Sequence, residues 1–154
     1  MINAHDYLQS FRVAEQRIQL KIQQVQKLRE QLINISAPLN QEQIAHTKNV
    51  GIMGDTVAAI IDIENEIDQQ TSQLYRRKKE AYHMLDQIRP ESAMLLIERF
   101  LNGKTVETMS RELHVCKRHA QRKLNDAILE FQSILNTLEY SLVITDTAKS
   151  GSII

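Results

Sequence analysis

The sequence predicts an all-α protein: a long antiparallel helical hairpin, coiled-coil-like, followed by a helix-turn-helix module. Two long segments repeat apolar residues every seven positions, which is the spacing of a seam between helices. The chain has 154 residues with only 4 glycines and 2 prolines, so few positions interrupt a helix. Tryptophan is absent and aromatic residues make up 5%, which suits aliphatic seams better than one large globular core.

The first predicted helix covers residues 5–34. Its seven-residue stripe and the positions that widen it are Phe11, Ile18, Val25 and Leu32, with Leu8, Ile22 and Leu28. The other faces carry Gln, Arg, Lys and Glu, so the helix is amphipathic. Residues 36–54 follow as a connection with a short helical turn at 40–47, because Pro38 disfavours helix at the residue before it and two glycines come later.

A second long helix is predicted for residues 56–88, capped by Asp55 or Thr56. Its seven-residue stripe consists of Ile60, Ile67, Leu74, Ala81 and Ile88. Because the two helices are about equal in length, an antiparallel hairpin is the simplest arrangement. The register that we favour pairs Leu32 with Ile60, Val25 with Ile67, Ile18 with Leu74, and Phe11 with Ala81. This register also brings Lys27 and Arg29 near the acidic residues Asp62, Glu64 and Glu66. The same stripes would serve an intermolecular coiled coil, and that alternative stays open.

Residues 89–138 predict the helix-turn-helix module. Pro90 suits the first turn of a helix, where its missing N–H has no consequence, and the apolar segment 91–101 continues it. Asn102-Gly103 ends this helix, with Gly103 in the left-handed conformation. Thr105 then caps a short helix at about 106–113, and a tight turn at His114-Val115 leads into a longer helix at about 117–138. Residues 139–154 lack a helical period and are expected to form a flexible tail, within which LVIT resembles a short strand; an apolar terminus that docks on a partner is the alternative.

Positive charge gathers in the predicted module. The chain carries 19 basic and 19 acidic residues, so its formal net charge is zero. Residues 104–123 nevertheless hold six Lys and Arg against two Glu, a local charge of +4. Local charge of this kind favours binding to nucleic acid even where the total is balanced.

The predicted helix at 117–138 divides its residues between two faces. Ala120, Leu124 and Ala127 lie on the apolar face. The residue types on the opposite face are those that read base edges: Arg and Lys pair with guanine, and Gln and Asn with adenine. The second helix of a helix-turn-helix uses its N-terminal residues in the major groove of DNA. The candidate reading residues are Lys117, Arg118, His119, Gln121, Arg122 and Asn125, and the candidate phosphate-positioning residues are Lys104, Thr105 and Arg111.

The segment LNGKTVETMSRELHVCKRHAQRKLNDAILEF resembles the helix-turn-helix of sigma-factor region 4, most closely in GKTVETMSRELHV. Over residues 5–135, the chain resembles phage-encoded transcriptional regulators of the RinA and ArpU type, which join an N-terminal helical hairpin to such a module. The resemblance implies a sequence-specific regulator of transcription from a phage or mobile element. Double-stranded DNA is the expected partner. Because one monomer of this size would give weak specificity, dimerisation or contact with RNA polymerase is expected, the latter by analogy with sigma-like modules, and the hairpin would bind a second copy or another protein.

The chain departs from the pattern of this family at five positions. The family has a small residue where Met109 stands, glycine at His114, serine at Cys116, a bulky aliphatic at Ala120 and an apolar residue at Lys123. Met109 and Ala120 are expected to compensate, because the large side chain has moved across the helix–helix contact. Glycine is favoured at the turn because its backbone must be left-handed, so His114 is expected to adopt that conformation at some cost.

Other classes of function find little support in the sequence. No glycine-rich phosphate loop, nucleophile elbow or HExxH motif is present, so we expect no enzyme and no cofactor. His114, Cys116 and His119 form H-x-C-x-x-H, but a structural zinc site needs four ligands and no second pair is suitably spaced. Cys116 is the only cysteine, and neither a signal peptide nor a membrane-spanning segment is evident, so a cytoplasmic protein is expected.

One alternative function remains. The helical hairpin could itself be the working part of the protein, as in an adaptor or anti-repressor that binds another helix. The helix-turn-helix would then be a degenerate module that does not bind DNA.

Overall fold

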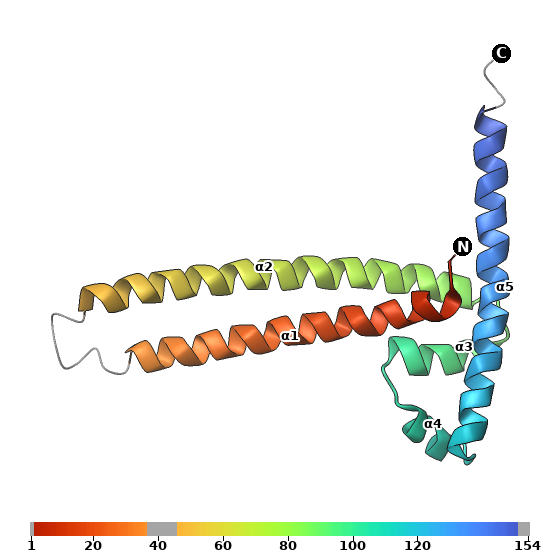
Figure 1. Cartoon of the computed structure of the whole chain (residues 1–154), viewed down its shortest axis with the longest axis horizontal. Coiled ribbons are helices and arrows are strands. Elements are labelled where there is room, and N and C mark those ends of the chain that lie inside the picture. The colour runs from red at the N-terminus through yellow and green to blue at the C-terminus, as the bar shows by residue number, and fades with distance from the viewer. Residues whose placement is uncertain (1, 37–45, 151–154) are drawn as a thin grey trace. The chain divides into compact units, whose positions relative to one another are not determined.

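The computed structural model describes residues 2–36 and 46–150, and every regular element in these two ranges is helical (Figure 1). In chain order, the elements are α1 (Ala4–Ser36), α2 (His46–Leu85), α3 (Pro90–Leu96), the π-helical turn η2 (Ile97–Leu101), α4 (Val106–Glu112) and α5 (Lys117–Ser150). The predicted all-α class is therefore confirmed. Within the described ranges, no helix combines the length and the apolar character that crossing a membrane requires.

The chain divides into two compact units, each described by itself. The hairpin unit is Ala14–Tyr75, and the helix-turn-helix unit combines Met1–Val13 with Arg76–Ile154. This division differs from the predicted boundary at residue 88, because the outer ends of α1 and α2, residues 4–13 and 76–85, pack with α5. The Tyr7 and Phe131 ring centroids lie 6.0 Å apart, and the Ala4 backbone N–H donates to Gln132 Oε1 over 2.7 Å.

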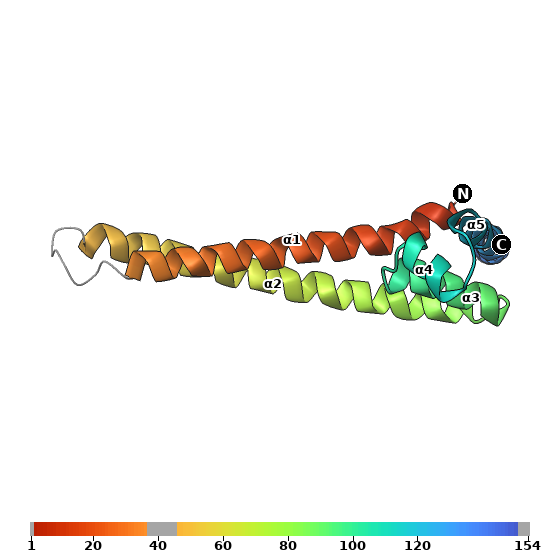
Figure 2. The same ribbon diagram turned by 90° about the horizontal axis from the view of Figure 1, so that it is seen from below.

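In the hairpin unit, α1 and α2 run side by side in opposite directions (Figures 1 and 2). The seam between them buries Ile18, Val25, Ile60 and Leu74. Arg29 forms an ion pair with Glu64, as the predicted register expects, and Lys21 forms one with Glu66. The apolar stripes therefore pair within one chain, and the predicted hairpin is confirmed.

The start of α2 differs from the prediction. The helix begins at His46, so residues 46–54 belong to it and not to a connection, while the rest of the predicted connection, 37–45, lies outside the described residues. Asp55 and Thr56 are not caps: the Thr56 hydroxyl donates to the Ile52 carbonyl inside the helix over 2.8 Å. Met53 stands seven residues before Ile60 and is half-buried, so the seam extends back past the glycines that suggested a loop.

The C-terminal segment also differs from the prediction. The helix expected to end at residue 138 continues as α5 to Ser150, so residues 139–150 are helical and LVIT is not a strand. No glycine or proline occurs between Gly103 and Gly151, so nothing in the sequence breaks the helix earlier. The last part of the predicted flexible tail, 151–154, lies outside the described residues.

The core of the helix-turn-helix unit joins the outer ends of α1 and α2 to α3, η2 and α5. Its largest buried side chains are Leu8, Phe11, Leu85, Leu96, Phe100, Leu124 and Phe131. The Arg77 guanidinium lies 4.8 Å from the centroid of the Phe11 ring and donates to Ser10 Oγ, which closes one side of this core. The Lys78 ammonium donates to the Leu101 carbonyl, so α2 also satisfies the end of η2.

A carboxylate on α5 holds the start of α3. Glu130 accepts hydrogen bonds from the Ser92 hydroxyl at 2.7 Å and from the Arg89 backbone N–H at 2.9 Å, and its two oxygens also pair with the Arg89 guanidinium. These bonds satisfy a backbone donor that the start of a helix leaves unpaired. They lower the pKa of Glu130 to about 2, the Ser92 hydrogen bond being the largest cause, followed by those from Arg89.

Replacing Glu130 with glutamine is expected to lower the stability of the fold at neutral pH. It should also reduce the loss of stability that the wild type shows as the pH falls. The ordinary pKa of 4.5 applies in the unfolded chain and about 2 in the folded one. The carboxylate therefore stabilises the fold fully above pH 4.5 and loses this effect as the pH falls toward 2. Urea midpoints measured by circular dichroism between about pH 6 and pH 2.5 test this. Glu80→Gln, at an exposed position, is the control and should keep the wild-type slope. Equal slopes for wild type and Glu130→Gln would contradict the role of Glu130.

Candidate nucleic-acid interface

The residues predicted to start, end and cap the helices α3, η2 and α4 adopt those roles in the structure. α3 begins at Pro90, and Gly103 adopts a φ of 74° after η2. The Thr105 hydroxyl accepts a hydrogen bond from the Thr108 backbone N–H over 3.2 Å and so caps α4. These three predictions are confirmed, and they fix where α4 starts.

The turn between α4 and α5 is left-handed at His114, as expected. His114 has a φ of 54°, and it is the only non-glycine residue in the described ranges with a positive φ. The Val115 backbone N–H then donates to the Ser110 carbonyl over 3.0 Å, which closes the end of α4. The Cys116 carbonyl accepts from the Ala120 N–H, so α5 begins directly after Cys116.

Replacing His114 with glycine is expected to stabilise the fold by about 0.5–1 kcal/mol. The left-handed conformation costs an L-residue about 1–2 kcal/mol, and the greater freedom of unfolded glycine offsets part of the gain. The His114 side chain is exposed, so its removal leaves no cavity. Urea unfolding followed by circular dichroism measures the change. His114→Val is the opposite test and should destabilise, because a β-branched residue tolerates this conformation poorly. A loss of stability in His114→Gly would show that the ring itself holds the turn.

The inner face of α5 packs against α3 and α4. Ala120, Leu124, Ala127 and Phe131 are all buried, at three- and four-residue spacings. Met109 of α4 is 3% exposed and Ala120 is 1% exposed, so these two of the five positions at which the chain departs from the resembled family lie in the core. The predicted buried face of this helix is thereby confirmed.

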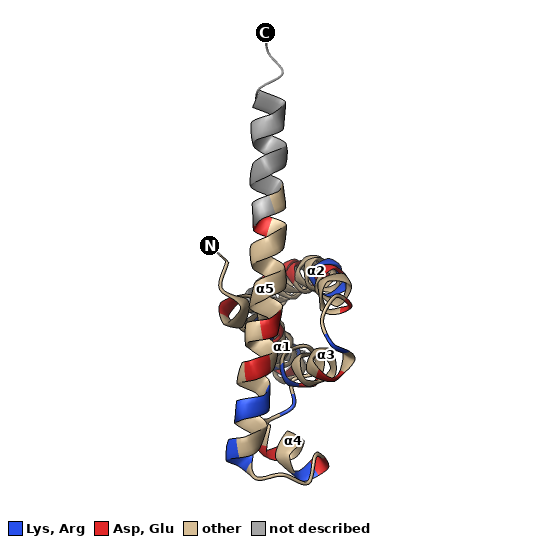
Figure 3. Ribbon diagram, turned by 90° about the vertical axis from the view of Figure 1, so that its right-hand side faces the viewer, with Lys and Arg blue, Asp and Glu red and all other residues tan. Residues whose placement is uncertain are grey.

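The outer face of α5 gathers the predicted reading residues. An open, shallow depression is lined by Lys117, Arg118, Gln121, Arg122 and Asn125. Their spacing places them on one side of the helix, in its first turns. Figure 3 shows Lys and Arg gathered at this end of α5. The structure therefore brings together five of the six residues predicted to read bases.

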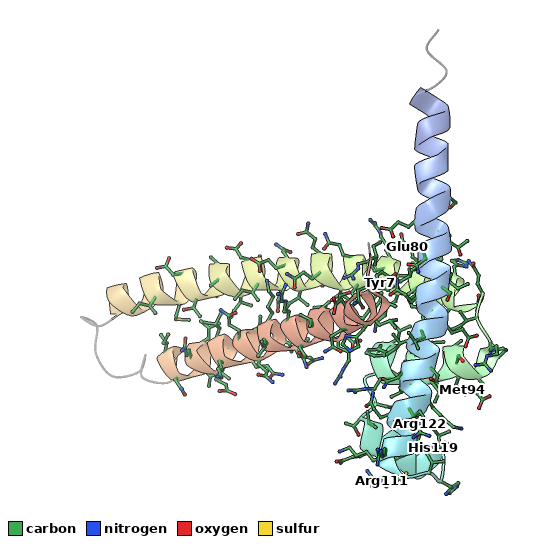
Figure 4. The ribbon with its side chains drawn as sticks, turned by 45° about the vertical axis from the view of Figure 1, so that its right-hand side comes forward. Tyr7, Glu80, Met94, Arg111, His119 and Arg122 are labelled. Atoms are coloured by element: carbon green, nitrogen blue, oxygen red, sulfur yellow. The ribbon has the colours of Figure 1, made fainter. Side chains whose placement is uncertain are left out.

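The other predicted residues surround this face. His119 of α5 and Arg111 of α4 are exposed and lie near Arg122 in the view of Figure 4, but neither lines the depression. The side chains of Arg111, Arg118 and Arg122 make no hydrogen bond and no ion pair with any residue in the described part of the chain. Arg118 and Arg122 are therefore two permanently charged groups that face solvent within the depression, whereas Arg111 of α4 interacts electrostatically with Glu107.

Lys117 and the two amides of the depression have partners within the fold. Lys117 Nζ lies 2.9 Å from Glu107 Oε1 at the start of α4, and its hydrogen bond lowers the pKa of Glu107. Both side chains are largely exposed, so this ion pair is weak and exchanges readily with a phosphate. Gln121 Nε2 donates to Asn125 Oδ1 over 3.0 Å, which holds the two amides one turn apart in a fixed orientation.

Lys104 and Thr105 lie outside the depression and are engaged in the fold. The Lys104 ammonium pairs with Glu98 and with Glu112, and these contacts raise its pKa, the Glu98 hydrogen bond being the largest cause. The Lys104 carbonyl accepts from the Arg99 guanidinium over 2.8 Å. Both residues therefore shape the entrance to α4, and their polar groups are less available to DNA than those of Arg111.

Two glutamates shape the charge of this surface and were not singled out from the sequence. Glu107 pairs with Lys117 across the turn, and Glu91 lies 4.0 Å from Lys123. A signal existed for the first of them, since an acid in the first turn of α4 complements the helix dipole. Its partner could be identified only once the turn had placed the starts of α4 and α5 together.

Within the described residues, no three His, Cys, Asp or Glu side chains lie close enough to hold a metal ion. The His114, Cys116 and His119 side chains accordingly form no metal cluster in this region. No family model, curated protein or solved structure matches the chain.

Proposed function

We propose that this chain binds double-stranded DNA in a sequence-specific manner and regulates transcription, with α5 lying in the major groove. The observation that carries the proposal is the outer face of α5: five side chains that read bases or bind phosphates line one open depression, and two of its arginines have no partner in the described structure. Because this face is the N-terminal part of the second helix of a helix-turn-helix, it is the one that meets base edges in such motifs.

The chemistry of each side chain suggests its role. Arg118 and Arg122 pair with guanine O6 and N7, and Gln121 and Asn125 are suited to adenine. Lys117, released from Glu107, binds a phosphate at the edge of the groove, and so does Arg111 from α4. His119 lies beside this set as a further contact. Lys104 and Thr105 position the start of α4 through their contacts within the fold.

The resemblance to phage-encoded regulators supports a more specific form of the proposal. It supports a cytoplasmic regulator of a phage or mobile element that acts either as a homodimer or in contact with RNA polymerase. These parts rest on analogy of fold and residue pattern.

The proposal is tested by selection from a random pool of DNA duplexes, followed by titration of the selected and of scrambled duplexes at about 50 and 200 mM salt. We expect binding to the selected duplex at least about a thousandfold tighter than to the scrambled one, because specific sites exceed non-specific ones by this margin. Affinity should fall steeply with salt, because phosphate contacts release counterions. Equal affinity for both duplexes would exclude sequence-specific recognition.

A second candidate function is a protein-binding adaptor or anti-repressor that acts through the hairpin. It is favoured by the exposed apolar side chains of the hairpin unit, which include Leu20, Ile33 and Ile61. A protein of this kind would bind its partner equally well after the arginines of α5 are replaced, and DNA would not compete.

A further inference from the structure

The hairpin unit carries a second apolar face that nothing within the described chain covers. Val50, Gly54, Val57 and Ile61 are spaced by four, three and four residues, so they lie on one side of α2. The three large side chains are between 42% and 52% exposed. The seam with α1 uses a different side of the helix, through Ile60 and Leu74. We call the four residues the outer stripe.

Two glycines in this part of α2 leave open space at the outer stripe. Gly51 and Gly54 stand inside a helix, where glycine is among the least favourable residues. A Cβ atom built at either position would meet nothing within 4 Å, so no packing inside the described chain calls for the missing side chain. A smooth, apolar helix surface of this kind allows another helix to approach closely.

We infer that the outer stripe is a homodimer interface in which α2 packs antiparallel against α2 of a second copy of this chain. In that crossing, Val50 of each copy faces Ile61 of the other, and Gly54 faces Val57. The large Val57 side chain enters the space that Gly54 leaves open, as close packing requires. Because each contact occurs twice about a twofold axis, the stripe is complementary to itself, which is the property of an isologous interface.

Charge favours the antiparallel arrangement over a parallel one. Asp68 stands seven residues after Ile61, so it continues the line of the outer stripe, and it is exposed. A parallel pair would set the two Asp68 carboxylates against each other, whereas the antiparallel crossing places them at opposite ends. Glu64, beside the stripe, is already paired with Arg29 of its own chain. The contact is therefore apolar in its centre, and neither Asp68 nor Glu64 faces its own counterpart across it.

The extent of the stripe predicts a weak and reversible dimer. It spans Val50 to Ile61, about 17 Å of helix, with Ile33 of α1 exposed at the same end of the hairpin. A stable dimer buries roughly 800 Å² per partner, from about 20–30 residues, and this stripe offers fewer. We therefore expect dissociation in the micromolar range.

The test is sedimentation velocity of the full chain over a wide concentration range, with a reductant present because Cys116 is exposed. Wild type should show a monomer–dimer equilibrium, and Val57→Glu should weaken it at least about tenfold, because a charge would be buried without a partner. Ile52→Glu is the matched control: Ile52 is equally exposed but nine residues before Ile61, on the opposite side of α2, and should change the dissociation constant less than about twofold.

Gly54→Leu is a second variant that distinguishes loss of the interface from misfolding. Leucine favours helix more than glycine, so this variant should keep or raise the helical signal in circular dichroism while it blocks the close crossing. Dimerisation lost in Val57→Glu and Gly54→Leu, but kept in Ile52→Glu, supports the interface. A monomer at all concentrations, or a dimer unaffected by these changes, would overturn it. So would equal weakening by Ile52→Glu.

The outcome can be separated from that of the proposed DNA binding. Self-association needs no DNA, and an Arg118→Ala/Arg122→Ala variant should dimerise as the wild type does, because both arginines lie in the other unit. A chain that binds DNA as a monomer would refute the interface and leave the proposed function standing. A dimer without sequence-selective DNA binding would do the reverse.

Discussion

Replacing Arg118 and Arg122 together with alanine is expected to weaken specific DNA binding by about 2–6 kcal/mol, since a bidentate contact to guanine is worth about 1–3 kcal/mol. Both guanidinium groups are exposed and have no partner in the described structure, so DNA would be their first strong partner. Fluorescence anisotropy with the selected and the scrambled duplex measures the loss. Affinity for the selected duplex should approach that for the scrambled one, because base contacts specify sequence whereas phosphate contacts only position the protein.

A matched pair of basic residues outside the depression serves as the control for this experiment. Arg76 and Lys79 of α2 are exposed in the same unit but lie outside the depression. Their double replacement by alanine removes the same formal charge and should leave sequence selectivity unchanged. Circular dichroism should show intact helices in both variants, because surface replacements of this kind shift stability little. Undiminished selectivity in a folded Arg118→Ala/Arg122→Ala protein would refute α5 as the reading helix.

The boundaries of the helix-turn-helix were predictable because each depends on local chemistry. Proline at a first helical turn, glycine in a left-handed position and threonine as a cap act within a few residues of the chain, and Pro90, Gly103 and Thr105 occupy these roles. Even His114 follows this logic: the backbone of the turn requires a positive φ, and the histidine adopts it. Tertiary context had little to add at these positions.

The ends of the long helices were harder to predict, because packing overrides local preference. Gly51 and Gly54 favour a loop when considered alone, yet Met53 continues the seam of α2 through them. Residues 139–150 lack a clear apolar period, yet α5 continues through them. The outer ends of α1 and α2 belong to the same compact unit as α5, which a seven-residue repeat does not reveal.

The candidate site likewise has a part that the sequence predicts and a part that depends on tertiary packing. The face that carries Arg118, Gln121 and Arg122 follows from helical periodicity, and the structure brings these side chains together as expected. The partners of the lysines depend on how α4, α5 and η2 meet. Glu107 holds Lys117, while Glu98 and Glu112 hold Lys104, and no spacing in the sequence indicates these pairs. Lys104 and Lys117 therefore form ion pairs within the fold, whereas Arg111, Arg118 and Arg122 form none in the described part of the chain, although each of the five carries the same formal charge.

Replacing Met109 with alanine is expected to destabilise the helix-turn-helix unit by about 2–5 kcal/mol, because it removes a buried side chain and leaves a cavity. Met109 is 3% exposed on α4, which packs against the inner face of α5, where Ala120 is 1% exposed. If the large residue has moved across this contact, Ala120→Leu alone should overpack it and lose about 1–3 kcal/mol. The double variant should then recover much of both losses, since leucine at 120 fills the space vacated at 109.

Urea unfolding of the wild type, both single variants and the double variant gives a double-mutant cycle. A coupling of about 0.5–3 kcal/mol in the stabilising direction is expected for side chains that share one cavity. Met94→Ala is the matched control, because Met94 of α3 is exposed (Figure 4) and its loss should change stability by less than about 0.5 kcal/mol. Additive losses would show that Met109 and Ala120 fill separate spaces. Coupling would mean that the chain keeps the angle between α4 and α5 by exchanging volume across the contact, and this angle sets how α5 presents Arg118 and Arg122.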